Sequence, residues 1–377
     1  MVPQAEFRSY YGQPVIKSPI WHEPHMPVYL YLGGTSGAAS MLAAMATLTG
    51  RDRLALTARL VAAGGAAGGA AFLVAELGRP ERFLNMLRVF KPTSPMSVGS
   101  WVLAVHSGLT ALAAGSALVT PRRPPSGPPP SRLAAALPAR LAAVLSGTRP
   151  APSPSRTAGA AGAAGVAGVA ALRARLVAAL PSRAVTLLPA TGDAAGLVAV
   201  LTGPLMATYT AVLVADTAVP AWHEAHRELP FLFAGSALAG AGAASMLATP
   251  LRDAGPARAA AVLGATVETV AGAVMERRLG MLGEPYRQGV SGRLMRAARV
   301  LTVAGALLAP VAGRGRTLTA LSGLALTGGA LCTRFGVLRA GKASAADPKY
   351  TVVPQRERLE AARQEAARGE NGENAEI

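Results

Sequence analysis

The sequence predicts an all-α, multi-pass integral membrane protein with about eight transmembrane helices arranged as helix bundles. Hydrophobic residues make up 51% of the 377 positions, whereas charged residues make up 15% and aromatic residues only 5%. Apolar stretches recur along the chain at the length of a bilayer span, about 20 residues. Polar or basic connections separate these stretches, a pattern typical of membrane proteins and not of soluble multidomain chains.

The chain divides into five regions: a polar N-terminal tail (1–26), three transmembrane helices (27–119), a low-complexity insertion (120–190), five transmembrane helices (191–340) and a charged C-terminal tail (341–377). The tail at the N-terminus contains proline and acidic residues, unlike a secretory signal peptide, so the first span should direct insertion. The expected spans cover approximately 27–48, 54–77, 96–119, 192–219, 229–249, 257–279, 294–312 and 318–338.

The first two spans contain glycines at a spacing of four residues. Gly33 and Gly37 follow this spacing in the first span, as do Gly64, Gly65, Gly68 and Gly69 in the second. Small residues at this spacing let helix backbones approach closely where apolar burial does not drive association.

Residues 76–101, between the second and third spans, differ in chemistry from both. Gly78 and Pro80 predict a helix end. Phe83, Leu84, Leu87 and Phe90 alternate with polar residues at helical spacing, which predicts a short amphipathic helix in the membrane interface. The alternative is an ordinary basic loop. Pro92 and Pro95 should end the segment, and Ser94 or Ser97 can cap the next span.

The insertion and the C-terminal tail are weakly apolar. We expect 121–132 to be disordered or extended and 133–145 to form a short surface helix. Residues 158–171 contain only alanine, glycine and valine, and an additional membrane-embedded helix is the alternative there. In the C-terminal tail, 357–368 predicts a solvated helix, and an acidic, disordered end should begin at Gly369.

Eight spans would place both termini on the same side of the membrane. Nearly all histidines and tryptophans then fall on that side, together with most titratable residues near span ends. Aromatic belts should appear at both interfaces, so the asymmetry predicts a functional site and a docking surface on one face.

The net charge of +17 does not indicate nucleic-acid binding, because the basic residues lie between apolar spans and form no face of a soluble domain. They are typical of loops that set topology and contact lipid head groups. The short loops carry nine cations on the terminal side and five on the other. This count favours cytoplasmic termini, although nine further arginines in the insertion oppose it and leave the orientation open.

Cysteine and histidine usage excludes several redox centres. Cys332 is the single cysteine, so the chain holds no disulfide and no iron–sulfur cluster of its own. Of the five histidines, His106 alone lies well inside a span, which argues against a bis-histidine haem. His22, Glu23 and His25 lack a partner within a span, so we expect no metal site.

Two motifs resemble a known family. The first is L-G-R-P-E-R-F followed by K-P-T-S-P-M-S-V-G-S-W, and the second is Y-L-Y-L-G-G-T-S-G near residue 29. Both look like motifs of the polysulfide reductase membrane-subunit family of the NrfD/PsrC type. The resemblance covers roughly 20–120 and 190–340. It implies a quinone-reactive subunit of a respiratory oxidoreductase in the inner (cytoplasmic) membrane, and not a stand-alone enzyme. It also implies exchangeable menaquinone or ubiquinone, a ferredoxin-like iron–sulfur partner and a molybdopterin catalytic partner.

Quinol oxidation releases two electrons and two protons, so it requires a proton acceptor near the interface and donors for the quinone oxygens. The resemblance places quinone contacts on the first helix, at the acid ending the second and at the tyrosine of a Tyr-Thr pair in the fourth. Glu76 replaces the family's usual aspartate and adds one methylene of reach. The positions in this chain are Glu76, Tyr209 and His25, with Trp21, Tyr29 and Arg79 as further pocket candidates.

Charged groups within spans cost about 3 kcal/mol or more and mark functional hypotheses. Glu268 and Asp216, together with His106, could line a proton path. The structural alternative for Glu268 is a hydrogen bond to a threonine across helices. Two other functions stay open: an ion-coupled secondary transporter or channel that uses these residues, and a purely structural membrane anchor.

Overall fold

The computed structural model describes residues 15–119 and 182–373, and all regular elements in these two ranges are helical. Six of the helices are long and apolar enough to cross a membrane. The all-α, multi-pass membrane class is therefore confirmed, whereas the predicted number of eight spans is not. The six are α2 (Asp52–Glu76), α3 (Pro95–Val119), α6 (Ser182–Ala215), α8 (Leu229–Ala248), α9 (Gly255–Arg278) and α12 (Arg316–Ala346).

Two more long helices occupy predicted span positions but have more polar sequences. Helix α1 (His25–Leu48) contains the run Gly-Gly-Thr-Ser-Gly, and α11 (Gly289–Leu308) carries three arginines in its first eleven residues. Most residues of α1 are nevertheless buried, because neighbouring helices surround it. A central helix gains more from small side chains that allow close packing than from apolar bulk.

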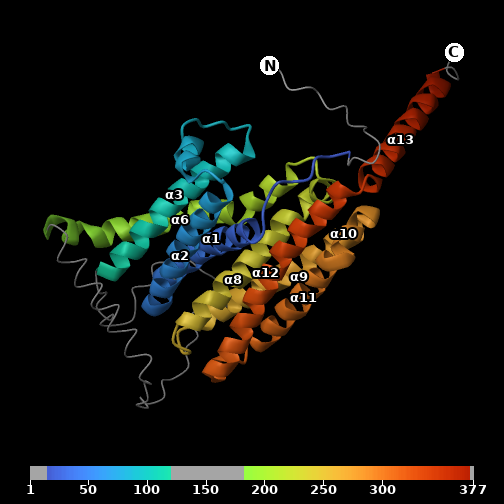
Figure 1. Ribbon diagram of the computed structural model, residues 1–377. Helices are drawn as coiled ribbons and strands as arrows, with labels where there is room; N and C mark the ends of the chain where they lie inside the picture. The colour runs from blue at the N-terminus through green and yellow to red at the C-terminus, as the bar shows by residue number, and fades with distance from the viewer. Residues whose placement is uncertain (1–14, 120–181, 374–377) are drawn as a thin grey trace.

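The long helices form two groups that lie side by side (Figure 1). The first bundle contains α1, α2, α3 and α6, and the second contains α8, α9, α11 and α12. Helix α1 joins the bundles through contacts with α8 and α12. Glycines allow the closest approaches within the first bundle. A Cβ atom at Gly65 would lie 2.8 Å from the backbone oxygen of Leu32, and one at Gly37 would lie 2.8 Å from Cβ of Met206.

The segment between α2 and α3 differs from its prediction. Helix α2 ends at Glu76, and Gly78 adopts φ +65°, the left-handed conformation that commonly follows a helix. The expected short helix is present as a 3₁₀ helix, η1 (Pro80–Leu87), which stops before Phe90. Its short repeat fits a connection between two prolines at 80 and 92. The predicted cap of α3 is confirmed, since Ser94 Oγ accepts a hydrogen bond from the Ser97 amide at 3.4 Å.

Other helix boundaries also differ from the predicted ones. Helix α6 begins at Ser182, about ten residues before the expected span, and α13 (Lys349–Glu373) is longer than the predicted 357–368 helix and includes Gly369. The expectations for 121–132, 133–145 and 158–171 lie outside the described residues. Short helices form the connections: α7 (Pro220–Glu224), η2 (Ala225–Arg227), η3 (Gly280–Gly283), α10 (Glu284–Arg287) and η4 (Ala312–Arg314).

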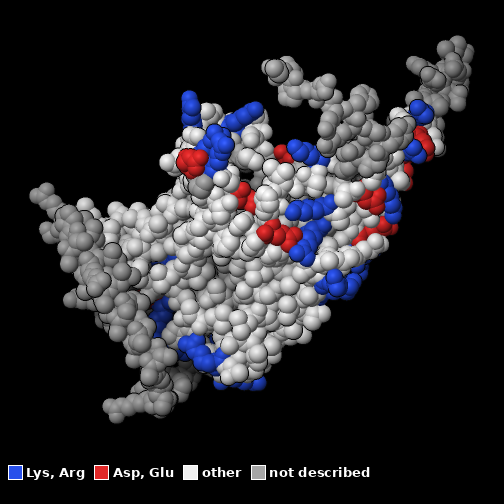
Figure 2. Space-filling model, in the orientation of Figure 1, with Lys and Arg blue, Asp and Glu red and all other residues white. Residues whose placement is uncertain are grey.

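Charged side chains gather toward the ends of the helices on the face shown in Figure 2, and a broad belt of uncharged atoms separates them. One end of the protein carries the start of α1, the end of α2, the start of α3 and the end of α6 (Figure 1). We call this end the Glu76 end. The uncharged belt matches the surface that a hydrocarbon layer requires.

Candidate functional site

Glu76, the last residue of α2, contacts the segment that leads into α1. Its Oε1 accepts a hydrogen bond of 2.8 Å from the backbone amide of His22, and the His22 Nδ1 atom lies 3.3 Å from the same oxygen. The Glu76 side chain is only 10% exposed. A helix end therefore holds a nearly buried carboxyl group against a second piece of chain.

The other carboxyl oxygen of Glu76, Oε2, is available to accept a hydrogen bond. Oε2 is buried and has no hydrogen-bond partner among the described residues. Its neighbour is Nδ1 of His25, 3.6 Å away, which is beyond hydrogen-bond length but within reach of an ion pair when His25 is protonated. A buried acceptor without a partner costs about 1–3 kcal/mol, so this atom should gain from a donor supplied by a ligand or by water.

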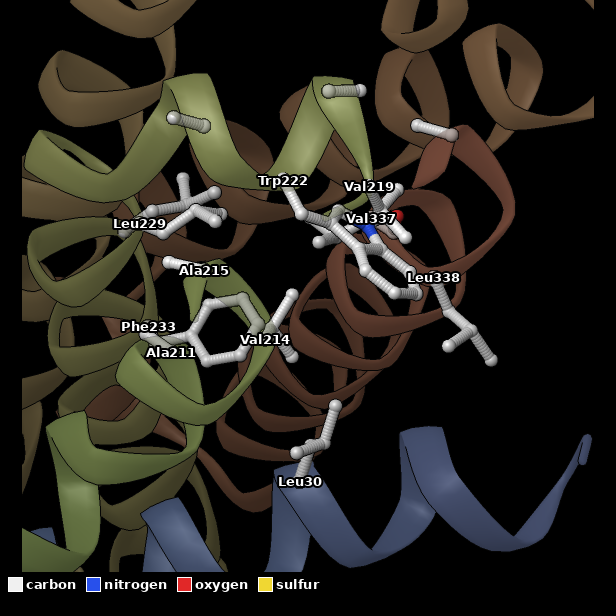
Figure 3. Close-up of a cluster of buried hydrophobic side chains, with 14 of the residues drawn as sticks. Leu30, Ala211, Val214, Ala215, Val219, Trp222, Leu229, Phe233, Val337 and Leu338 are labelled. Carbon is white, nitrogen blue, oxygen red and sulfur yellow. Dashed lines mark hydrogen bonds between the residues drawn. The ribbon is translucent and has the colours of Figure 1, made fainter. Parts of the chain in front are cut away.

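Aromatic rings lie on the segments that meet at Glu76. The His25 ring lies 6.2 Å from that of Phe72, one turn before Glu76 on α2. Trp21 stacks on Trp222 at 5.2 Å between ring centroids. Trp222 is fixed in turn, because its Nε1 donates to the carbonyl oxygen of Val337 at 2.7 Å, and Figure 3 shows its indole ring among Val219, Val337 and Leu338.

Tyr29 and Tyr209 approach the same apolar cluster from α1 and α6. Tyr29 is 2% exposed and belongs to the cluster, and Tyr209 packs against it together with Phe72. The ring of Tyr209 occupies the space that a side chain at position 99 of α3 would need, so Gly99 makes room for it. The structure thus brings the two tyrosines to one cluster with Trp21, although neither hydroxyl contacts Glu76.

Arg79 does not join the group. Its side chain is exposed, and it forms no ion pair with Glu76 or with any other acid in the described part of the chain. The partners of Glu76 are histidines, because Gly78 turns the chain away from α2 before Arg79.

Comparison with known families agrees with the motifs at this site. Residues 13–120 match the family model described as Polysulphide reductase, NrfD. The predicted resemblance is confirmed over these residues, and the family is one of membrane subunits of polysulfide- or quinone-type oxidoreductases. No curated protein matches the chain.

The NrfD match covers Trp21, His25, Tyr29, Glu76 and Arg79. It ends before α6, so the resemblance over 190–340 and the role of Tyr209 stay predictions. The slot for a quinone beside Glu76 also stays a prediction. Described residues line three cavities away from Glu76. One lies among α1, α2, α3 and α6 near Arg59, one near Glu268 in the second bundle, and one between α10 and the end of α12.

The residues of the predicted proton path do not meet. His106 lies in the NrfD-matching region and is fully buried, with Ser36 Oγ 3.1 Å from Nε2 and Thr202 Oγ1 2.8 Å from Nδ1. Glu268 lies in the second bundle, and Asp216 is exposed just after α6. The hydrogen bond that we considered for Glu268 exists: Thr333 Oγ1 of α12 donates to its Oε1 at 2.6 Å.

Some residues of the Glu76 end did not emerge from sequence reasoning. His22 was considered only as a metal ligand, yet its backbone amide binds Glu76. Arg339 of α12 forms a two-pronged ion pair with Glu23, at 2.6–3.0 Å, which holds the segment before α1 against the second bundle. A cation near the end of an apolar run signals such a partner, but the sequence does not say which acid it will meet.

The second bundle contributes a polar network to the same end. Arg278 of α9 forms an ion pair with Glu228 that starts α8, at 2.5 Å. Tyr286 of α10 donates to the carbonyl oxygen of Ala221 at 3.0 Å, and burial raises the pKa of its hydroxyl group. Glu284 binds Lys349 at 2.7 Å, and this hydrogen bond holds the pKa of the Glu284 carboxyl group below its ordinary value.

Proposed function

We propose that the chain is the quinone-reactive membrane subunit of a respiratory oxidoreductase in the inner (cytoplasmic) membrane. Quinol gives up two electrons and two protons to become quinone. The electrons pass to an iron–sulfur partner at the Glu76 end, and the protons pass to side chains of this subunit. Menaquinone or ubiquinone is the substrate, and the reaction belongs to the complex and not to this chain alone.

The observation that carries the proposal is the unpartnered Oε2 atom of Glu76, beside the His25 imidazole. A carboxylate oxygen accepts a proton from a quinol hydroxyl, and a neighbouring imidazole takes it onward. The aromatic cluster with Trp21, Tyr29 and Tyr209 offers the flat apolar surfaces that a quinone ring favours.

The partners follow from the NrfD match and from the charge at this end. Family members assemble with other redox subunits, and we propose a ferredoxin-like iron–sulfur subunit and a molybdopterin catalytic subunit here. The η1 connection exposes Arg82 and Arg88 at the Glu76 end. Exposed cations of this kind steer an acidic partner surface toward the site.

The test is quinol-dependent turnover of the intact complex in membranes or detergent. Glu76→Gln combined with Tyr209→Phe should lower turnover by about 100-fold or more, the usual contribution of a positioned acid–base group. Glu76→Asp should keep part of the activity, because it restores the carboxylate that is usual in the family. Activity of the catalytic partner with an artificial electron donor should not change, which separates the membrane site from the rest of the complex.

Unchanged quinol-dependent turnover in the double variant would contradict the proposal. So would a parallel loss of activity with the artificial donor, because this would place the defect in assembly of the complex and not in quinol chemistry.

A further inference from the structure

The second bundle contains a buried carboxyl group that the quinone site does not use. Glu268 lies in the middle of α9 and is 5% exposed. Thr333 satisfies its Oε1 atom, but Oε2 is buried without a hydrogen-bond partner. An acid at this depth in a membrane bundle needs a compensating group or water.

A buried arginine faces the same region from α12. Arg334 has no exposed surface, and its Nη2 atom donates to the carbonyl oxygen of Phe233 at 3.0 Å. Its guanidinium carbon lies 3.7 Å from the centre of the Phe233 ring. The Nε and Nη1 atoms lack partners. The charges of Arg334 and Glu268 interact, but no direct hydrogen bond joins these two described residues.

Two hydroxyl groups complete the surroundings of the carboxyl group. Ser236 of α8 and Thr302 of α11 face Glu268, and neither hydroxyl oxygen has a hydrogen-bond partner. Unsatisfied donors and acceptors therefore converge from several helices of the second bundle. Buried polar groups are nearly always satisfied, either by protein atoms or by ordered water.

A cavity adjoins the cluster. It measures about 30 Å³, and Glu268, Thr302 and Thr333 line it together with Glu276 and Arg299. This volume accommodates about two water molecules. Glu276 lies eight residues further along α9 toward the Glu76 end, about 12 Å for an α-helix, and forms an ion pair with Arg299 of α11 at 2.5 Å. The Arg299 side chain is 49% exposed.

We propose that Glu268 is a proton-binding site, hydrated through this cavity and in exchange with the Glu76 end by way of the Glu276–Arg299 pair. Water in the cavity contacts Glu268 and carries protons between its carboxyl group and the Glu276–Arg299 ion pair. The site goes beyond the proposed quinone chemistry and does not depend on it. It replaces the earlier path through His106 and Asp216, which lie in or beside the first bundle.

The surroundings favour a proton over a metal cation. The charged and titratable groups that face the cluster are Arg334 from α12, Arg299 from α11 and Glu276 on α9 itself. Helix α8 contributes only the Ser236 hydroxyl, and Tyr31 of α1 lies near Arg334. A metal cation needs several oxygen ligands around it, whereas a proton needs only one carboxyl oxygen. The described residues contain no group of three or more metal-ligating side chains.

The first test is infrared difference spectroscopy of the full-length protein during a pH step. The wild type should show a band of a protonated carboxyl group that appears as the pH falls and shifts after exchange into D₂O. Glu268→Gln should lose this band, whereas Glu276→Gln should keep it. A wild-type spectrum identical to that of Glu268→Gln, or a band that does not shift in D₂O, would overturn the proposal.

The second test locates the route and uses the single cysteine. In a Cys332→Ala background, Ala298→Cys places a thiol on the cavity wall, and Ala241→Cys on α8 is a buried control outside it. A small water-soluble thiol reagent should modify the Ala298→Cys variant from the Glu76 side at least tenfold faster than the control. Equal rates for the two variants, or faster modification from the opposite side, would refute the route. Slower modification of the Ala298→Cys variant in the presence of sodium ions at constant pH would also overturn the proposal, because it would identify sodium and not a proton as the bound ion.

Discussion

Nδ1 of His25 lies 3.6 Å from Oε2 of Glu76 and thereby joins the first turn of α1 to the last turn of α2. The contact brings an imidazole and a carboxyl group from different helices to one point at the membrane edge. His22 approaches the other oxygen of Glu76, but its main contribution is a backbone amide. The two histidines therefore support the carboxyl group in different ways, which a pair of substitutions can separate.

His25→Ala should lower quinol-dependent turnover by about tenfold or more, because the proton relay loses its imidazole. His22→Ala should change turnover by less than about threefold, because the backbone amide that binds Glu76 remains. The measurement is the steady-state rate of the intact complex with saturating and limiting quinol. Equal losses in the two variants would mean that both imidazoles act alike, contrary to the geometry.

Gly99→Ala should displace Tyr209, because the added methyl group would overlap the tyrosine ring. Overpacking of this kind costs about 1–3 kcal/mol, so the melting temperature in detergent should fall. If Tyr209 serves the quinone, the KM for quinol should rise as well. Gly108→Ala is the matched control on the same helix: its methyl group meets open space, and alanine favours a helix. A fall in stability for both variants would indicate a general effect on α3.

Trp222→Phe should lower stability by about 1–3 kcal/mol, since the buried hydrogen bond from the indole to the carbonyl oxygen of Val337 is lost and the smaller ring leaves space behind. The ring that stacks on Trp21 remains, so the activity should fall less than the stability. Thermal denaturation measures the stability and quinol turnover measures the activity of the same preparation. Turnover that fell far more than stability would show that the indole N–H itself takes part in the reaction.

The docking of α13 should weaken in acid. The Lys349 ammonium group holds the pKa of Glu284 below the ordinary value of 4.5. A carboxyl group with a lowered pKa contributes stability above that ordinary value, and the contribution disappears as the pH falls through the pKa of the folded state. The protection of α13 amides, measured as the ratio of the intrinsic to the observed exchange rate at each pH, should therefore fall in this acid range. Glu284→Gln should lower this protection at neutral pH and remove most of its dependence on pH in the same range.

Pattern in the sequence predicted the helical class and the family resemblance because both depend on long stretches. Apolar length identifies a span whatever packs against it, and the motifs at 77–101 are continuous. The short helix between the second and third spans was predicted, but its 3₁₀ type and its end before Phe90 were not. Apolar spacing over eight residues fits both an α-helix and a 3₁₀ helix, and the flanking prolines decide between them.

The residues around Glu76 were predicted one by one, but their partners were not. Arg79, three positions from Glu76 in sequence, was the nearest charge to consider, yet His22 lies within bonding distance although 54 positions separate it from Glu76. Contacts between distant segments depend on how the helices pack, which a single sequence does not reveal. Arg334 was overlooked because it lies within an apolar run, although an arginine at such a place is itself a signal of a buried partner.

The ion pair between Glu23 and Arg339 bridges 316 positions of the chain. It closes the membrane domain into a ring, in which the entry to α1 and the exit from α12 are neighbours. The order in which the helices are connected is therefore not the only one that this architecture permits. A circular permutant that fuses these two neighbours and opens the turn between α8 and α9 would preserve the arrangement of both bundles.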